Sequence, residues 1–200
     1  ELSRMLDGFF AGVTAGEDVP AAADTAVVVS PHAGYVFSGP VAAHGFKAVA
    51  SRKVSTVIIL APTHHISFQG ASVWAEGAFT TPLGPVAVDH ELAARIMAAD
   101  KIFTFRRDAF EGVPGYPENS VETQIPFIQR TFPEARIVPI IMGFPPDPGV
   151  AQAVAAALVR VLGGRDDVLV AVSVDQSHFH PQTEAKAIDR KGLEAIEKFD

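Results

Sequence analysis

The sequence predicts an α/β domain with a mainly parallel sheet flanked by helices. Short runs are apolar at every position, each run is followed by a loop that contains histidine or glycine, and helical patterns fill the intervals. Runs without polar positions are typical of strands that are covered on both faces, as in a parallel sheet. Strands that alternate with helices are expected to form right-handed crossover units.

Four runs have the length and composition of buried strands. They are residues 25–30 (TAVVVS), 56–61 (TVIILA), 136–142 (RIVPIIM) and 168–174 (VLVAVSV). Pro139 lies inside the third run and has no amide hydrogen to donate. Its presence predicts that this strand lies at an edge of the sheet or contains a bulge.

Helical spacing of apolar residues predicts the helices between these strands. One helix face carries Val150, Val154, Ala157, Leu158 and Val161, and another carries Ala185, Ile188, Gly192, Ala195, Ile196 and Phe199. A third helix contains Leu92 and Ile96, with Asp89 as its N-cap.

Two further segments have recognisable local patterns. Asn119 and Glu122 have the spacing of a capping box, which predicts a helix over 120–132 that Pro126 kinks or interrupts. The segment 71–89 is rich in glycine and proline and predicts a strand–loop–strand excursion.

Composition excludes several classes of function. The chain has 200 residues, which is the length of one domain, and its 16 basic and 23 acidic residues give a formal net charge of −7. An acidic chain without Lys and Arg clusters predicts no nucleic-acid partner. The absence of cysteine excludes disulfides and thiolate metal sites within these residues. No apolar run is long enough for a membrane span and no signal peptide is present, so the expected location is cytoplasmic.

The histidines are concentrated after the predicted strands. Five of the seven follow the end of an apolar run within a few residues: His32, His64, His65, His178 and His180. Open α/β sheets bind ligands beyond the carboxyl ends of their strands, where loops converge. We therefore expect three loops to bring imidazoles and the Asp175 carboxylate to one edge of the sheet. Imidazole and carboxylate are ligands that suit iron, zinc, copper or nickel.

The histidines do not all carry the same expectation. His32 and His64, which occupy similar contexts after two strands, are the candidate metal ligands. His65 is expected either to orient its neighbour or to contact a substrate. His44, His90 and His180 are assigned surface or structural roles, because loop and helix histidines are most often of that kind.

Two carboxylates have alternative interpretations. Asp175 belongs either to the site or to a helix cap. Glu122 either completes the capping box or accepts a hydrogen bond from a site imidazole and so fixes its tautomer. The turn-rich segment 114–124 is expected to cover the sheet edge as a lid.

Other catalytic motifs are missing. The sequence has no G-x-S-x-G elbow, P-loop, G-x-G-x-x-G or H-E-x-x-H pattern. Ser173, Asp175, Ser177 and His178 include the residue types of a hydrolase triad, but they lie too close together in sequence to form an in-line relay with one another.

Six segments together resemble the Memo family, whose microbial members are called AmmeMemoRadiSam system protein B. They are SPHAGYVFSG (30–39), APTHH (61–65), TPLGPVAVD (81–89), ENSVETQIPFIQ (118–129), IVPIIMG (137–143) and VSVDQSH (172–178). The matches occur in order along nearly the whole chain, and the first two are distinctive.

The resemblance implies a fold shared with class III extradiol ring-cleaving dioxygenases, which are nonheme Fe(II) enzymes. By that resemblance His32 and His64 are metal ligands, and His178 occupies the place of the catalytic acid/base with Asp175 beside it. The expected cofactor is a divalent metal, Fe(II) in the first place, with copper or zinc as alternatives. The microbial family name implies AMMECR-type and radical SAM proteins as partners.

The chain departs from the family pattern in three ways. The family's third metal ligand follows the D-x-x-H stretch in a region that these residues do not include, and the start of the pattern before the first helix is also missing. Asn119 stands where the family usually has histidine. We therefore expect residues 1–200 to be a single Memo-like domain that lacks its N-terminal start and its C-terminal part.

Three functions remain open at this point. The first is a metal-dependent, dioxygenase-like redox enzyme built on His32, His64 and His178. The second is a non-catalytic module that binds a small molecule or peptide in the same cleft. The third is a metal-assisted hydrolase, which ranks last because no carboxylate is clearly placed as the base.

Overall fold

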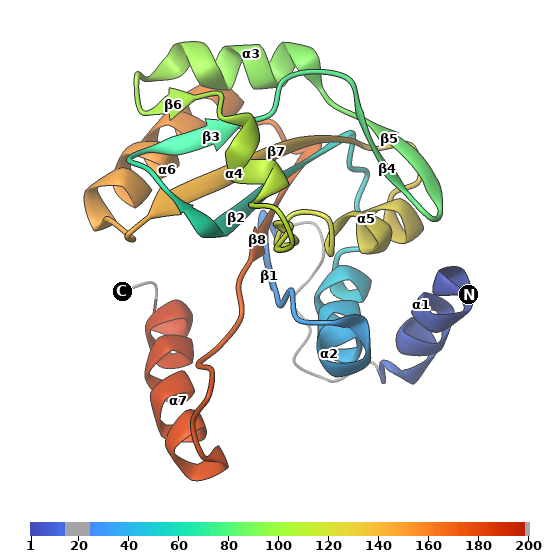
Figure 1. The fold of residues 1–200 in the computed structure, drawn as a ribbon. Helices are drawn as coiled ribbons and strands as arrows, with labels where there is room; N and C mark the ends of the chain where they lie inside the picture. Colours follow the sequence, from blue (N-terminus) through green and yellow to red (C-terminus); the bar gives the residue numbers. More distant parts are fainter. Residues whose placement is uncertain (15–24, 199–200) are drawn as a thin grey trace.

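The computed structural model describes residues 1–14 and 25–198, in which strands and helices alternate as the sequence predicts (Figure 1). The strands are β1 (Val27–Ser30), β2 (Thr56–Ser67), β3 (Ala71–Val73), β4 (Ala78–Thr81), β5 (Gly84–Ala87), β6 (Phe103–Thr104), β7 (Arg136–Phe144) and β8 (Val168–Ser173). The helices are α1 (Leu2–Gly12), α2 (Tyr35–Ala48), α3 (His90–Ala99), α4 (Arg107–Glu111), α5 (Ile125–Thr131), α6 (Pro148–Leu162) and α7 (Gln182–Lys198).

The central sheet of the described residues has six strands in the order β1-β8-β2-β7-β3-β6. The strands β1, β8, β2 and β7 run parallel to one another, whereas β3 is antiparallel to β7 and parallel to β6. The short hairpin β4–β5 forms the excursion predicted over 71–89. The predicted α/β class, with a mainly parallel sheet between helices, is confirmed.

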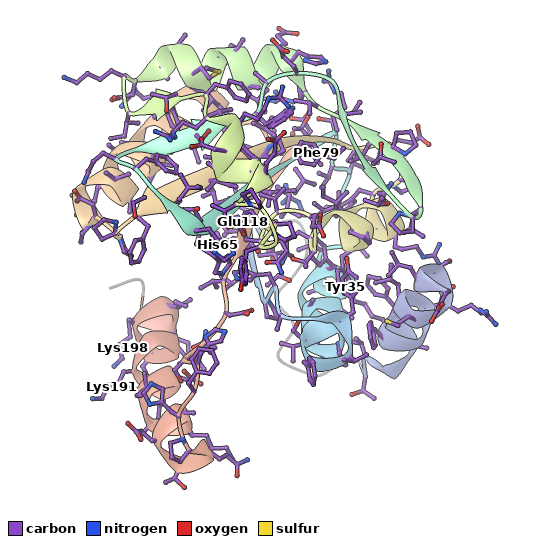
Figure 2. The ribbon with its side chains drawn as sticks, viewed as in Figure 1. Tyr35, His65, Phe79, Glu118, Lys191 and Lys198 are labelled. Carbon is purple, nitrogen blue, oxygen red and sulfur yellow. The ribbon has the colours of Figure 1, made fainter. Side chains whose placement is uncertain are left out.

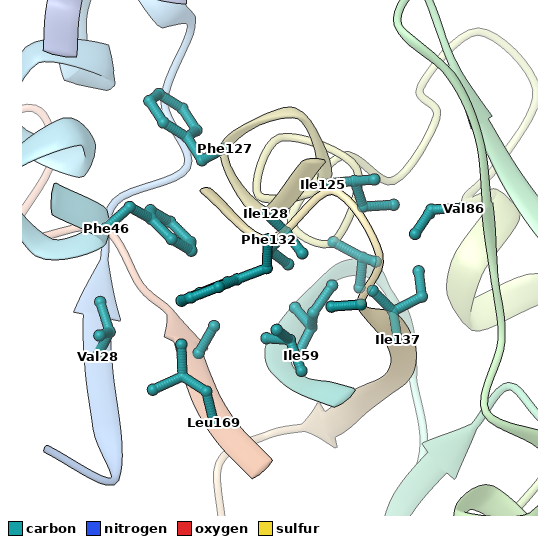
Figure 3. Packing of buried hydrophobic residues seen from close by; sticks show 14 of the residues in the cluster. Val28, Phe46, Ile59, Val86, Ile125, Phe127, Ile128, Phe132, Ile137 and Leu169 are labelled. Atoms are coloured by element: carbon teal, nitrogen blue, oxygen red, sulfur yellow. The ribbon is translucent and has the colours of Figure 1, made fainter. Parts of the chain in front are cut away.

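Helices cover both faces of this sheet and create two hydrophobic clusters. Alternate side chains of β2 point to opposite faces of the sheet. Ile59 packs in the cluster under α1, α2 and α5, and Ile58 packs in the cluster under α3 and α6. Figure 3 shows the first cluster, in which Phe46 of α2 stacks on Phe127 of α5. The apolar run of β2 therefore packs on both sides, which explains why it lacks polar positions.

The run at the start of the chain departs from this pattern. Val28 is buried, but Val27 and Val29 are exposed. Because β1 pairs only with β8 among the described strands, it forms an edge of the described sheet. In the described residues one face of β1 is open, so the expectation of cover on both faces is wrong for this strand.

The expectation for Pro139 is also wrong. Its strand β7 lies inside the sheet between β2 and β3. The proline is tolerated because β3 pairs with β7 only from Ile140 to Met142, so that Pro139 lies just beyond the end of that ladder. Its carbonyl still accepts a hydrogen bond from the amide of Trp74 at 3.0 Å. No hydrogen bond of the sheet is therefore lost because Pro139 lacks an amide hydrogen.

The capping box predicted at Asn119 and Glu122 does not form. The helix α5 begins at Ile125, with Gln124 as its N-cap and Pro126 in the first turn, where a missing amide hydrogen costs nothing. Residues before it form turns. Pro126 therefore starts a helix instead of kinking one. The predicted cap at Asp89 is confirmed, since its side chain accepts from the amide of Leu92 at 3.1 Å.

The last helix stands apart from the body of the domain (Figure 1). None of its described residues is buried, and the predicted apolar face leaves Ile188 and Ile196 exposed. Phe199, which the sequence places on the same face, lies outside the described residues. The helix contacts the preceding loop, for example through a hydrogen bond from the amide of Ser177 to Asp189 Oδ1 at 2.9 Å. In the part of the chain that is described, no helix is long and apolar enough to span a membrane.

We predict that shortening Ile59 destabilises the domain far more than shortening an exposed residue. Ile59 is fully buried in the central strand, so Ile59→Ala is expected to cost about 2–5 kcal/mol of unfolding free energy. Val159→Ala on α6, where the side chain is 74% exposed, is expected to cost less than about 0.5 kcal/mol. Denaturant unfolding of both variants checks this, and equal midpoints would contradict the packing described.

Candidate metal and proton-transfer site

The predicted histidines meet where three neighbouring parallel strands end. His32 follows β1, His64 lies near the end of β2, and Asp175 and His178 follow β8, which lies between the other two strands. The ring centroids of His32 and His64 are 5.2 Å apart and the rings meet edge to face at 81°. Residues from distant parts of the sequence therefore form one cluster at this edge of the sheet.

His32 is the buried member of the cluster, with 5% of its side chain exposed. Its Nδ1 lies 2.9 Å from Ser173 Oγ. Its backbone amide donates to Asp175 Oδ1 at 2.6 Å, and the amide of Ala33 donates to the same oxygen at 3.1 Å. Burial lowers the pKa of the His32 ring, although the negative charge of Asp175 acts in the opposite direction. The ring is therefore neutral near neutral pH, as a metal ligand must be.

The buried carboxylate of Glu118 contacts both the ring and the backbone amide of His64. The regular pairing of β2 with β7 shifts register between Pro62 and Ser67, and His64 lies in this irregular stretch. Its Nδ1 lies 2.8 Å from Glu118 Oε1, and its amide donates to Glu118 Oε2 at 2.7 Å. The other side of the His64 ring remains accessible, with 42% of the side chain exposed.

Glu118, which is labelled in Figure 2, holds the His64 ring through several hydrogen bonds. Besides its two bonds to His64, its Oε1 accepts from the amides of Asn119 and Ser120, each at 2.9 Å. Burial alone would raise the pKa of Glu118, but the hydrogen bonds from Ser120 and His64 outweigh it and lower the pKa. The carboxylate is thus a fixed negative charge that can only accept hydrogen bonds.

Asp175 connects His32 to His178. Its Oδ2 lies 3.4 Å from His178 Nε2 and 3.9 Å from His32 Nε2. The alternative role of Asp175 as a helix cap is wrong, because α7 begins only at Gln182. The side chain of His178 is 53% exposed, so its ring lies on the open side of the site.

The remaining predicted residues take up varied positions. The His65 ring lies 6.1 Å from the His64 ring and 5.9 Å from Tyr116, and it is exposed. Glu122 is exposed and makes no hydrogen bond to an imidazole within the described residues. It lies instead near Tyr35, whose pKa is raised to about 12 by burial of the phenol and by the charge of Glu122.

The histidines assigned structural roles lie elsewhere. His90 contacts the carbonyl of Ala75 at 2.6 Å, and His180 pairs with Glu184 at 3.2 Å. His44 is exposed on α2. None of them contributes to the cluster of His32, His64 and His178.

Sequence reasoning missed four residues of the site: Glu118, Ser120, Gln124 and Ser173. All four are buried polar residues, and buried polar groups normally serve a specific partner. The sequence does contain a signal for these residues. Glu118 and Gln124 stand at the two ends of the polar stretch that precedes the apolar start of α5. The capping-box spacing instead indicates Glu122, which contacts neither imidazole in the described residues.

The donor set suits a metal but is incomplete among the described residues. Within residues 1–14 and 25–198, no group of three or more ligating side chains is close enough to hold a metal ion. His32 and His64 nevertheless each use Nδ1 for a protein contact, and neither Nε2 has a hydrogen-bond partner within the described chain. A ligating histidine typically binds the metal through one nitrogen and a protein acceptor through the other. These two rings fit that pattern.

An apolar cavity of about 530 Å³ opens at the same edge, on the side of α6. Its wall includes Thr63 and Ser173, which neighbour His64 and contact His32 respectively. The rest of the wall is mostly aliphatic, with Leu60, Met142 and Val150 as examples. This volume matches a small-molecule site.

Comparisons with known proteins agree on one family. A model of the Memo-like protein family matches residues 1–200. A MEMO1 family protein of Thermotoga maritima is 39% identical over 174 residues, covering 86% of this chain and 61% of that protein. One from Caldivirga maquilingensis is 37% identical and covers 86% and 60%. One from Methanopyrus kandleri is 35% identical over 207 residues and covers 100% and 71%. The chain spans about three fifths of the length of the first two relatives.

We predict that Glu118→Gln weakens the fold in a manner that depends on pH. The pKa of Glu118 lies below its ordinary value of 4.5, so the carboxylate contributes stability above that value, and the contribution is lost as pH falls through the folded-state pKa. The variant is expected to be less stable near neutral pH by roughly 1–3 kcal/mol, and the difference should shrink below pH 4.5. Denaturant unfolding across this pH range measures it.

Glu111→Gln is the matched control for that prediction. Glu111 is an exposed carboxylate that pairs with Arg107 at 3.2 Å, and exposed pairs contribute little. We expect its unfolding midpoint to follow that of the wild type at every pH. If Glu118→Gln did the same, the buried carboxylate would not anchor the site.

Proposed function

This chain belongs to the Memo-like protein family, and we propose that it forms the core of a metal-dependent redox enzyme of dioxygenase type. One observation carries the proposal: two imidazoles, one just after β1 and one in β2, have ring centroids 5.2 Å apart, and each has a protein contact at Nδ1 and no hydrogen-bond partner at Nε2 in the described residues. Such an arrangement is typical of a metal centre more than of a structural histidine pair.

His32 and His64 are the residues that would hold the metal. Imidazole nitrogen suits Fe(II), the metal proposed first, and also copper or zinc. When bound, Fe(II) or copper would supply a redox-active centre, and the positive charge of any of these metals would favour loss of a proton from a bound substrate. Burial keeps the His32 ring neutral, and Glu118 orients the His64 ring.

His178 is proposed to move the proton. Its Nε2 lies 3.4 Å from Asp175 Oδ2 and its ring is half exposed, so it can accept a proton from a substrate hydroxyl at the open side of the site. Asp175 is fixed by the amides of His32 and Ala33, and its carboxylate then lies beside the charged imidazole. The proton would move from the substrate oxygen to Nδ1 of His178, because the Asp175 carboxylate can only accept and therefore favours hydrogen on Nε2.

A specific observation favours a second candidate, a ligand-binding module without catalysis. The apolar cavity on the α6 side is large enough for a small molecule and borders the same cluster. Its mostly aliphatic wall favours an apolar ligand or an apolar peptide side chain.

We predict that His32→Ala and His64→Ala each weaken binding of Fe(II) by more than about 100-fold, because each removes a nitrogen that contacts the metal. Anaerobic calorimetric titration of the full chain with Fe(II), together with metal analysis of the purified protein, measures this. His44→Ala is the control, since this imidazole is exposed on α2 and belongs to no cluster. Unchanged metal content in both site variants would contradict the proposal.

We predict that His178→Ala separates metal binding from catalysis. Fe(II) affinity should stay within about threefold of the wild type, whereas dioxygen consumption with an active catechol-type substrate should fall by about 10²–10⁴-fold. An oxygen electrode and a panel of catechols provide the measurement. A tight ligand that binds without metal and without turnover would favour the binding module instead.

A further inference from the structure

The hydroxyl of Ser173 has three polar neighbours. His32 Nδ1 lies 2.9 Å from Ser173 Oγ, the carbonyl oxygen of Ser120 lies 2.6 Å away, and Nε2 of Gln124 lies 3.0 Å away. Ser173 and Gln124 are both almost fully buried. A hydroxyl group has one hydrogen to donate and two lone pairs to accept with. Three neighbours therefore use all of its hydrogen-bonding capacity.

Two of these neighbours can act in only one way. The carbonyl of Ser120 can only accept, so it takes the hydroxyl hydrogen of Ser173. The amide of Gln124 is oriented independently, because its Nε2 also donates to the carbonyl of Pro31 at 2.9 Å. Because the Pro31 carbonyl cannot donate, the group of Gln124 that faces both Pro31 and Ser173 must be its NH₂. Gln124 therefore donates to Ser173 and occupies one of its lone pairs.

The hydrogen-bonding role of the third neighbour, His32 Nδ1, is then determined. With its hydrogen given to Ser120 and one lone pair used by Gln124, Ser173 can only accept from His32 Nδ1. We propose that Ser173 and Gln124 are positioning residues that hold His32 in the tautomer with hydrogen on Nδ1. Nε2 consequently keeps a free lone pair, and a metal would bind His32 through this lone pair.

The same segment sets the second imidazole. Glu118 can only accept, so His64 carries its hydrogen on Nδ1 as well. Ser120 ties the segment to β2 through a hydrogen bond from its Oγ to the carbonyl of Pro62 at 2.7 Å. Residues 118–124 thus determine the hydrogen positions on both imidazoles, directly at His64 and through Ser173 at His32.

The consequence for metal binding rests on the proposed function, whereas the hydrogen placement does not. The test therefore uses the metal-free full chain, labelled with ¹⁵N in histidine. The chemical shifts of the two ring nitrogens distinguish a protonated from an unprotonated nitrogen. In the wild type, His32 is expected to show hydrogen on Nδ1 and none on Nε2.

Ser173→Ala removes the acceptor from a site that water cannot easily reach. The ratio of the Nε2–H form to the Nδ1–H form of His32 is expected to rise roughly fivefold to tenfold, and Fe(II) affinity to fall about tenfold. Ser173→Thr keeps the hydroxyl and is expected to restore the wild-type ratio. Gln124→Met frees one lone pair of Ser173, so a smaller rise of about twofold is expected.

Ser30→Ala is the matched control. Ser30 pairs with Ser173 in the register of β1 and β8, it is equally buried, and its Oγ has no hydrogen-bond partner within the described residues. This substitution removes the same atom from the adjacent strand and is expected to leave the His32 tautomer unchanged.

The outcomes separate this inference from the proposed function. Hydrogen on Nε2 in the wild type, or the same tautomer ratio in Ser173→Ala and Ser30→Ala, would overturn it. Should Ser173→Ala fail to fold, Gln124→Met decides, and a ratio equal to that of Ser30→Ala overturns the inference. Hydrogen on Nδ1 in a chain that binds no metal would support the inference and overturn the proposed function.

Discussion

The parallel register of β1, β8 and β2 is the constraint on which the site depends. Ser30 of β1 pairs with Ser173 of β8. Two residues further along the two strands come His32 and Asp175, and the amide of His32 donates to that carboxylate at 2.6 Å. Because neighbouring parallel strands advance by equal steps, this contact follows from the pairing itself. A shift of β1 by one residue would turn its side chains to the other face, so that His32 would no longer lie beside Asp175.

The same edge of the sheet has to bury polar groups, which is costly unless each of them has a partner. His32, Glu118, Ser120, Gln124 and Ser173 are all buried, and their hydrogen bonds join the loop after β1, strands β2 and β8, and the segment before α5. An apolar core of the same shape would avoid that cost. What the polar cluster provides instead is a defined hydrogen position on each of two imidazoles, which an apolar core cannot supply.

Sequence reasoning could locate the strands and the loops of this site, because a fully apolar run and the polar residue that ends it are local features. It could not locate Glu118, whose role depends on the register shift in β2 that brings His64 to it. The expectations for Pro139 and Asn119 are wrong for a related reason. The proline is harmless only because β3 ends beside it, and the Asn119 spacing has no helix to cap because Pro126 starts α5 later. Long-range contacts decided each of these cases, and local patterns carry no information about them.

Burial divides the chemical roles among the imidazoles. His32 lies inside, and burial lowers its pKa, so that it remains an uncharged nitrogen donor. His178 lies outside beside Asp175, with half of its ring in contact with solvent, so that it can exchange a proton without opening the core. His64 is intermediate, with its Nδ1 side against the Glu118 carboxylate and the rest of its ring accessible. Under the proposed function, the metal needs uncharged nitrogen donors and the proton needs a separate carrier that is open to solvent. The sheet edge separates the two by placing them at different depths along one line of contacts from Ser173 through His32 and Asp175 to His178.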